Sequence, residues 1–265
     1  VHGFSTRPGG VSSAYGRADD LNLGFSKDDR RENVEKNRAR FLAALGAARW
    51  PVVTLRQVHS DLIHRVDRAP KSSPAGDGMI TRVPGLLLAI QTADCLPILV
   101  ADPDHRAVGA FHAGWRGTLA RIVEKGIGRM RKEFGSDPAK LVAAIGPGVR
   151  VCCYQVGREI RDQFESQFAY GGELFQDVYD SDPVRERYPL LFLTARAPGH
   201  SEQIGPQLHL DLALANRRQL EDAGVPARNI SDLGQCTVCK QRRLFSYRAT
   251  RGKTGRLLGT IGIRR

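Results

Sequence analysis

Apolar residues are grouped in short, compact runs in the middle of the chain. Two runs at 86–92 and 96–101 are followed by a third at 107–111, with turn residues such as Asp102-Pro103-Asp104 between them. Apolar runs of this length between turn residues are typical of buried strands. A further run at 141–145 ends at Gly146-Pro147 and predicts another strand.

Three other segments show the spacing of an amphipathic helix. The first is expected after a cap formed by Asp28 or Asp29 and ends at Gly46, and its apolar face consists of Val34, Phe41, Leu42 and Leu45. The second covers 117–134, and the third covers 211–223 and is stopped by Gly224.

The two ends of the chain and the region after residue 168 are less regular. Residues 9–13 predict a turn, and residues 21–24 a short strand or its end. The segments 244–248 and 257–263 predict a hairpin. The stretch 169–207 is rich in Gly, Pro and polar residues and predicts an irregular insertion.

Strands and helices are thus interleaved without a strict βαβ alternation. This order favours a single α/β (α+β) domain over residues 1–265, with mixed sheets flanked by helices, rather than a Rossmann fold. A Walker motif or a G-x-G-x-x-G motif would contradict this interpretation, and the sequence contains neither.

The net charge of the chain indicates which kind of partner it binds. Forty Lys and Arg against 28 Asp and Glu give a net charge of +12, which favours anionic partners. The basic residues are scattered and accompany no recognition-helix or RNP pattern, so phosphorylated metabolites are expected rather than nucleic acid. The apolar runs are too short to span a bilayer, so no membrane partner is expected.

The cysteines indicate the redox environment. Five cysteines, an odd number, argue against a disulfide scaffold and favour a reducing, cytoplasmic location. Cys236 and Cys239 have the spacing of half a zinc ribbon, but no second C-x-x-C pair accompanies them. Two ordinary cysteines near the start of a strand are therefore the favoured interpretation.

Three short segments carry candidate chemistry at strand ends or in loops. They are Gln57-Val58-His59-Ser60, Thr92-Ala93-Asp94-Cys95-Leu96-Pro97 and Phe111-His112-Ala113-Gly114-Trp115-Arg116-Gly117. Adjacent strands could bring Cys95 and His112 into one cleft. Two imidazoles and one thiolate suit zinc and leave its fourth position open, as in catalytic sites. The alternatives are a cysteine that is a small core residue and histidines that are merely hydrogen-bonded.

These segments, with several others, resemble the YfiH family, also described as laccase-domain proteins. The matching motifs extend from residue 3 to residue 256. They are Gly3-Phe4-Ser5-Thr6-Arg7, Gly9-Gly10-Val11-Ser12, Leu21-Asn22-Leu23-Gly24, Asn37-Arg38, the three segments above, Ile145-Gly146-Pro147, Phe245-Ser246-Tyr247-Arg248 and Thr254-Gly255-Arg256. Only the segment between Cys153 and His209 matches nothing in the family pattern.

The resemblance implies a fold related to a toxin cysteine deamidase, and zinc held by His59, Cys95 and His112. It also implies a purine nucleoside phosphorylase that cleaves adenosine, inosine, guanosine and methylthioadenosine with phosphate, and that deaminates adenosine. Zinc nucleobase deaminases use His and Cys ligands and a carboxylate in an H-x-E motif. That motif is absent here, so Asp94 and Asp77 are the candidate carboxylates, although both could be turn or cap residues.

Phosphorolysis also needs a phosphate-binding group, and arginine grips phosphate with a planar fork. Arg7, Arg116 and Arg248 lie in the matched motifs and are the candidates, with surface charge or ion pairing as the alternative. Trp115 could stack on a purine or belong to the core.

Three other functions remain open. A copper polyphenol oxidase needs many imidazoles, commonly as His-x-His, whereas this chain has seven histidines and no such pair. Copper could nevertheless occupy the zinc site adventitiously. Cys95 could instead be a nucleophile activated by His112, as in an amidase or deamidase. A basic module that binds nucleic acid without turnover is the non-enzymatic alternative.

Overall fold

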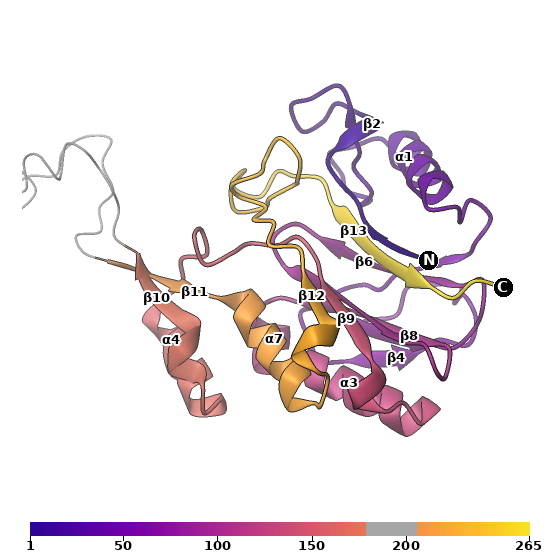
Figure 1. Cartoon of the computed structure of the whole chain (residues 1–265). Coiled ribbons are helices and arrows are strands. Elements are labelled where there is room, and N and C mark those ends of the chain that lie inside the picture. The colour runs from indigo at the N-terminus through magenta and orange to yellow at the C-terminus, as the bar shows by residue number, and fades with distance from the viewer. Residues whose placement is uncertain (179–205) are drawn as a thin grey trace, which may run out of the picture. The chain divides into compact units, whose positions relative to one another are not determined.

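The computed structural model describes residues 1–178 and 206–265, which form two compact units (Figure 1). The larger unit comprises Val1–Arg150 and Leu212–Arg265, and the smaller unit comprises Val151–Asp211. Within the described residues, no helix is both long and apolar enough to cross a membrane.

A six-stranded mixed sheet forms the centre of the larger unit. Its strand order is β12(Ile230–Asp232), β9(Val142–Ile145), β7(Leu96–Asp102), β8(Ala107–Ala113), β5(Gly78–Thr81) and β4(Ile63–Arg65). The β7–β8 pair is an antiparallel hairpin, whereas β12 runs parallel to β9 and β4 runs parallel to β5. The apolar runs of β7 and β8 are long because both strands are central and buried on both faces.

A second sheet has four strands and joins both ends of the chain. Its order is β1(His2–Phe4), β13(Leu257–Gly262), β6(Leu87–Thr92) and β3(Val52–Val53). The last strand, β13, runs antiparallel to both β1 and β6 (Figure 1).

The main core lies between these two sheets, and helices cover their outer faces. Core residues come from both sheets and are Val53, Leu55, Val66, Met79, Leu86, Leu88, Ile90, Leu99, Val108, Ala110 and Ile261. The helices α3(Ile122–Phe134) and α7(Leu212–Asp222) pack beside the six-stranded sheet (Figure 1). On the other side, Phe41 of α1(Arg31–Ala44) packs with Ala89 and Leu258 of the four-stranded sheet.

The remaining elements are short. The larger unit also contains β2(Pro8–Ser12), α2(Trp115–Leu119), η1(Pro138–Lys140) and η3(Ala227–Asn229). The smaller unit contains α4(Arg158–Gln167), η2(Gly171–Leu174) and an antiparallel pair formed by β10(Phe175–Val178) and β11(Gln207–Leu210). Its buried Phe164 packs against Phe168 and Phe175.

The α/β class with mixed sheets and flanking helices is confirmed, and so are the four central strands. The predicted helix over 117–134 is broken in two, because Arg121 adopts a left-handed backbone with φ of 61° between α2 and α3. The first helix begins after Arg30, without a side-chain cap, so the predicted Asp28 or Asp29 cap is wrong.

Three expectations outside the central strands are wrong. Residues 9–13 are not a turn, since 8–12 form β2, and residues 21–24 are not a strand. The 244–248 and 257–263 hairpin does not form, because β1 and β6 occupy both edges of β13. The insertion at 169–207 includes strands at its two ends, while its residues 179–205 lie outside the described part of the chain.

Candidate active site

The β7–β8 hairpin brings Cys95 and His112 together. Leu96 pairs with Ala113 and Pro97 pairs with His112, so Cys95 precedes β7 at the end where β8 finishes. The predicted proximity of the Cys95 and His112 side chains is therefore a direct result of the hairpin register. His112 is 4% exposed, and Cys95 is half-buried.

His59 reaches the same place from the loop between β3 and β4. Its backbone is left-handed, with φ of 59°. The neighbouring Gln57 holds this loop against β6, because its side chain donates to the Gln91 carbonyl oxygen at 2.8 Å and accepts from the Gln91 amide at 2.9 Å. Gln57 lies in one of the three candidate segments, but its pattern does not predict this role.

Asp77, at the start of β5, organises both histidines. Its buried carboxylate accepts hydrogen bonds from the backbone amides of Val58, His59 and Ser60 and from the Ser60 hydroxyl. It also bonds His112 Nδ1 at 2.8 Å. Donors from His112 and Ser60 outweigh the effect of burial and hold the Asp77 pKa well below its usual range. Asp77 is thus a charged positioning residue, not the proton carrier considered from the sequence.

The three side chains form a set of donors that fits a single metal ion. Their ligand atoms lie within 4.8 Å of one another, and Cys95 Sγ is 3.9 Å from His59 Nε2. A tetrahedral zinc ion would separate such sulfur and nitrogen atoms by about 3.6 Å, given the usual bond lengths. Because Asp77 holds Nδ1 of His112, Nε2 remains to face an ion, the usual arrangement of metal-binding histidines.

Gly114 leaves the space that this arrangement needs. A Cβ atom at this position would lie 2.9 Å from Cys95 Sγ and 3.1 Å from His59 Cδ2. Its φ of −83° suits any residue, so close approach rather than backbone conformation requires glycine here.

Cys95 and His112 also form a strongly coupled acid–base pair. Burial alone would raise the pKa of the Cys95 thiol, but His112 outweighs burial and lowers this pKa to about 6. Burial alone would lower the His112 pKa, but the Cys95 thiolate and the Asp77 carboxylate raise it to about 9. The thiolate form of Cys95 is the form that binds metals and attacks electrophiles.

Asp94 does not point its carboxylate into this cluster. One oxygen accepts from Thr237 Oγ1 at 2.6 Å and the other from the Arg248 backbone amide at 2.7 Å. The Asp94 backbone is left-handed, with φ of 98°, and its carbonyl accepts from the Val149 amide. The candidate role of Asp94 as a catalytic carboxylate is therefore corrected to that of a positioning residue beside Cys95.

Arg7 is likewise corrected. Its guanidinium donates to both carboxylate oxygens of Asp20, at 2.7 and 3.1 Å, and to the carbonyl oxygens of Tyr15 and Gln241. Four of its five N–H groups are therefore committed in a region where Arg7 is only 9% exposed. This arginine ties the N-terminal segment to the rest of the unit rather than binding phosphate.

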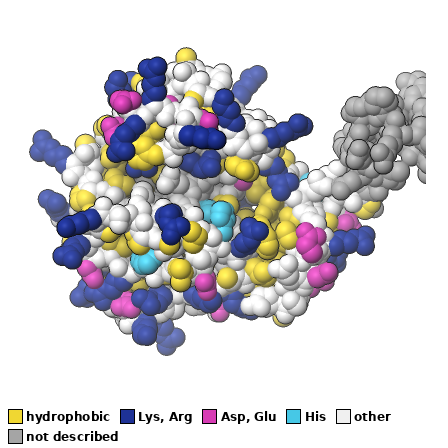
Figure 2. All heavy atoms as spheres, turned by 180° about the vertical axis from the view of Figure 1, so that it is seen from behind, with side chains coloured by type: hydrophobic (Ala, Val, Ile, Leu, Met, Phe, Trp, Pro, Cys, Tyr) yellow, Lys and Arg dark blue, Asp and Glu magenta, His cyan; other side chains and the backbone are white. Residues whose placement is uncertain are grey.

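Arg116 and Arg248 remain candidates for phosphate binding, since both side chains are exposed. Arg116 is the second residue of α2, two residues after Gly114, and its guanidinium lies 4.4 Å from the centre of the Trp115 ring. Arg248 is joined to the site through its backbone bond to Asp94. Figure 2 shows a face with a histidine in a central hollow and basic side chains spread widely around it.

Known proteins are similar to this chain over nearly its whole length. A family model described as multi-copper polyphenol oxidoreductase laccase matches residues 1–264. The chain belongs to this laccase family. The family description names a multi-copper enzyme, and such enzymes use many histidine ligands. Of the two possible metal-binding clusters among the described residues, one contains two histidines and the other contains none.

Relatives within this laccase family confirm the resemblance to YfiH. A purine nucleoside phosphorylase of Deinococcus radiodurans is 38% identical over 268 residues, covering 100% of this chain and 89% of that protein. Purine nucleoside phosphorylase YlmD of Geobacillus stearothermophilus is 34% identical, covering 100% and 90%. The solved structure of YfiH from Bacillus licheniformis has a TM-score of 0.82 at 31% identity, covering 99% and 92%.

Proposed function

We propose that this laccase-family chain is a zinc-dependent purine nucleoside phosphorylase. Adenosine deaminase and methylthioadenosine phosphorylase are its expected side activities. The observation that carries the proposal is the convergence of His59, Cys95 and His112 on one point. Asp77 bonds both the loop that carries His59 and the imidazole ring of His112. The names of the relatives, which are purine nucleoside phosphorylases, support this function.

Zinc suits the three donors better than the hard cations do, because thiolate and imidazole are its common ligands. Bound there, zinc would supply Lewis-acid chemistry to a substrate oxygen or nitrogen. The protein's contribution is to orient the ligands: Asp77 fixes the tautomer of His112, and Gly114 allows the Cys95 and His59 side chains to approach.

The reaction exchanges one bond at the ribose anomeric carbon for another. The bond from C1′ to the purine nitrogen breaks, a bond from C1′ to a phosphate oxygen forms, and the departing base takes up a proton. We assign phosphate orientation to Arg116 and Arg248 because arginine binds phosphate in two places. Tyr247, adjacent to Arg248 and 54% exposed, offers a ring for purine stacking, although the Arg256 guanidinium lies 5.9 Å from its centre. The Arg116 guanidinium lies closer to the Trp115 ring, at 4.4 Å.

The test is incubation of the purified protein with inosine or adenosine and phosphate, followed by chromatography. We expect free purine base and ribose 1-phosphate in equal amounts, and neither product when phosphate is omitted. Inosine formed from adenosine without phosphate would report the deaminase activity. Absence of base release from every purine nucleoside would refute the phosphorylase assignment.

The same site favours one competing function, a cysteine amidase or deamidase. The lowered pKa of Cys95 and its contact with His112 are what a cysteine nucleophile requires. A thiolate bound to metal is a weaker nucleophile, so the two functions exclude each other.

Copper-dependent phenol oxidation, in keeping with the family description, is a further competing function. Since zinc has no redox chemistry, a phenol should be oxidised only after copper loading.

Replacing Arg248 with lysine should raise the phosphate concentration needed for half-maximal phosphorolysis by about tenfold, because one of two charge-assisted hydrogen bonds is lost. Arg116→Lys should act in the same direction. Deamination uses no phosphate and should be nearly unchanged in both variants. Arg131→Lys, on the exposed surface of α3, is the matched control. Equal loss of both activities would remove phosphate binding from these arginines.

A further inference from the structure

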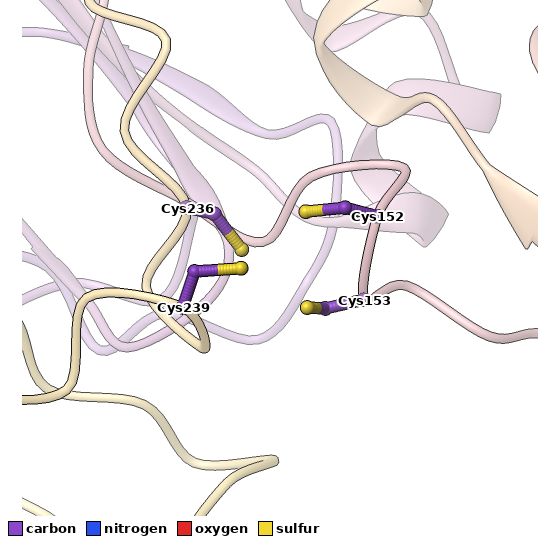
Figure 3. A group of neighbouring side chains, drawn as sticks. All are labelled: Cys152, Cys153, Cys236 and Cys239. Atoms are coloured by element: carbon purple, nitrogen blue, oxygen red, sulfur yellow. The ribbon is translucent and has the colours of Figure 1, made fainter. Parts of the chain in front are cut away.

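Outside the proposed active site, four cysteines come together from two segments far apart in sequence. The sulfur atoms of Cys152, Cys153, Cys236 and Cys239 all lie within 4.8 Å of one another. Figure 3 shows Cys236 and Cys239 pointing toward Cys152 and Cys153, so that the four thiols face a common centre. The sequence interpretation of Cys236 and Cys239 as two ordinary cysteines missed this group, because the partner pair consists of adjacent residues instead of a second C-x-x-C.

The spacing of the sulfurs matches a single tetrahedral ion. Zinc–sulfur bonds of about 2.3 Å place the sulfurs of a four-thiolate site about 3.8 Å apart. An iron–sulfur cluster attaches its thiolates to separate iron atoms and would spread them farther apart than 4.8 Å. Soft thiolate ligands select zinc over the oxygen-binding cations.

The local backbone holds both pairs in suitable conformations. In the Cys236-Thr237-Val238-Cys239 loop, the Lys240 amide donates to the Cys236 carbonyl oxygen at 3.0 Å, which closes a tight turn. Cys152 and Cys153 lie in a turn rather than a strand, so adjacent side chains need not point to opposite sides.

We propose that these four cysteines bind a structural zinc ion, separate from the ion proposed at His59, Cys95 and His112. All four positions of this ion would be filled by the protein, which is the arrangement of a structural rather than a catalytic zinc.

The segments next to the four-cysteine site are bonded to the residue that precedes Cys95. Thr237 donates through its hydroxyl to the Asp94 side chain, and the Val149 amide donates to the Asp94 carbonyl oxygen. The Thr237 amide also donates to the Gly148 carbonyl oxygen at 3.0 Å. The structural zinc would therefore keep the surroundings of Asp94 fixed without taking part in the reaction.

Metal counting by native mass spectrometry and elemental analysis tests the proposal, using protein purified under reducing conditions without added metal. We expect two zinc ions per wild-type chain, one in Cys239→Ser and one in His112→Ala. Val238→Ser changes the same loop without removing a thiol and should retain two. X-ray absorption of zinc in His112→Ala should show sulfur neighbours only, a readout that does not depend on the folding of a cysteine variant.

Three results would overturn the proposal. They are a His112→Ala chain without zinc, nitrogen neighbours around the zinc it retains, or an intact mass lower by four hydrogens, which would mean two disulfides. Failure of the active-site assignment is distinguishable, because wild type would then hold one zinc that is lost in Cys239→Ser but not in His112→Ala.

Discussion

Replacing His112 with alanine should abolish zinc binding at the proposed active site and lower the rate of phosphorolysis by about a thousandfold or more, since a lost Lewis acid is worth several kcal/mol. The reason is that His112 is the most buried of the three ligands and the one held by Asp77. Elemental analysis and chromatography of the nucleoside reaction measure the two effects on one preparation.

His105→Ala is the matched control for this variant. His105 Nδ1 bonds the buried carboxylate of Asp102 at 3.0 Å, just as His112 bonds Asp77, but neither of the metal-binding clusters found among the described residues includes His105. Its zinc content and activity should be those of the wild type. If the wild-type protein instead lacks zinc at this site and Cys95 is freely alkylated, the nucleophilic cysteine function replaces the zinc function.

Replacing Asp77 with asparagine should weaken zinc binding about 10- to 100-fold, the usual effect of losing the carboxylate behind a metal-binding histidine. The amide cannot accept from His112 and from the amides of 58–60 with the strength of a carboxylate, and its NH2 group faces donors. Unfolding free energy should fall by about 1–3 kcal/mol. Competition with a chelator measures the affinity, and denaturant titration measures the stability.

Asp102→Asn separates the two effects. Asp102 is also a buried carboxylate that bonds a histidine and two backbone amides, those of Asp104 and His105, at the far end of β7 from Cys95. This variant should lose similar stability but keep the zinc affinity of the wild type. If Asp77→Asn loses stability and no zinc affinity, Asp77 is a structural residue only.

How much of the candidate site the sequence predicts depends on how local the contacts are. The juxtaposition of Cys95 and His112 follows from two apolar strands joined by a short turn, because a turn of fixed length sets the register of the hairpin. His59 joins them through the family resemblance alone. Its position depends on two hydrogen bonds of its loop to residues far away in sequence. His59 bonds Asp77, 18 positions away, and Gln57 bonds Gln91, 34 positions away.

The arginines show the opposite case. Arg7, Arg116 and Arg248 look equivalent in the sequence, because each is a basic residue in a matched motif. Only the folded chain separates Arg7, whose partner Asp20 is buried, from the two exposed arginines. Asp94 and Asp77 are similarly alike in sequence, and their hydrogen bonds alone show that both are positioning residues.

The sequence by itself determined the α/β class, the central strands and the family, because apolar runs and short motifs consist of residues that are close together in sequence. Tertiary structure decided which strands pair at the chain ends, where β13 lies between β1 and β6 instead of forming a hairpin. It also decided the four-cysteine group, whose two halves are separated by more than eighty residues. Contacts across such distances depend on the packing of the whole domain, and no local pattern encodes them.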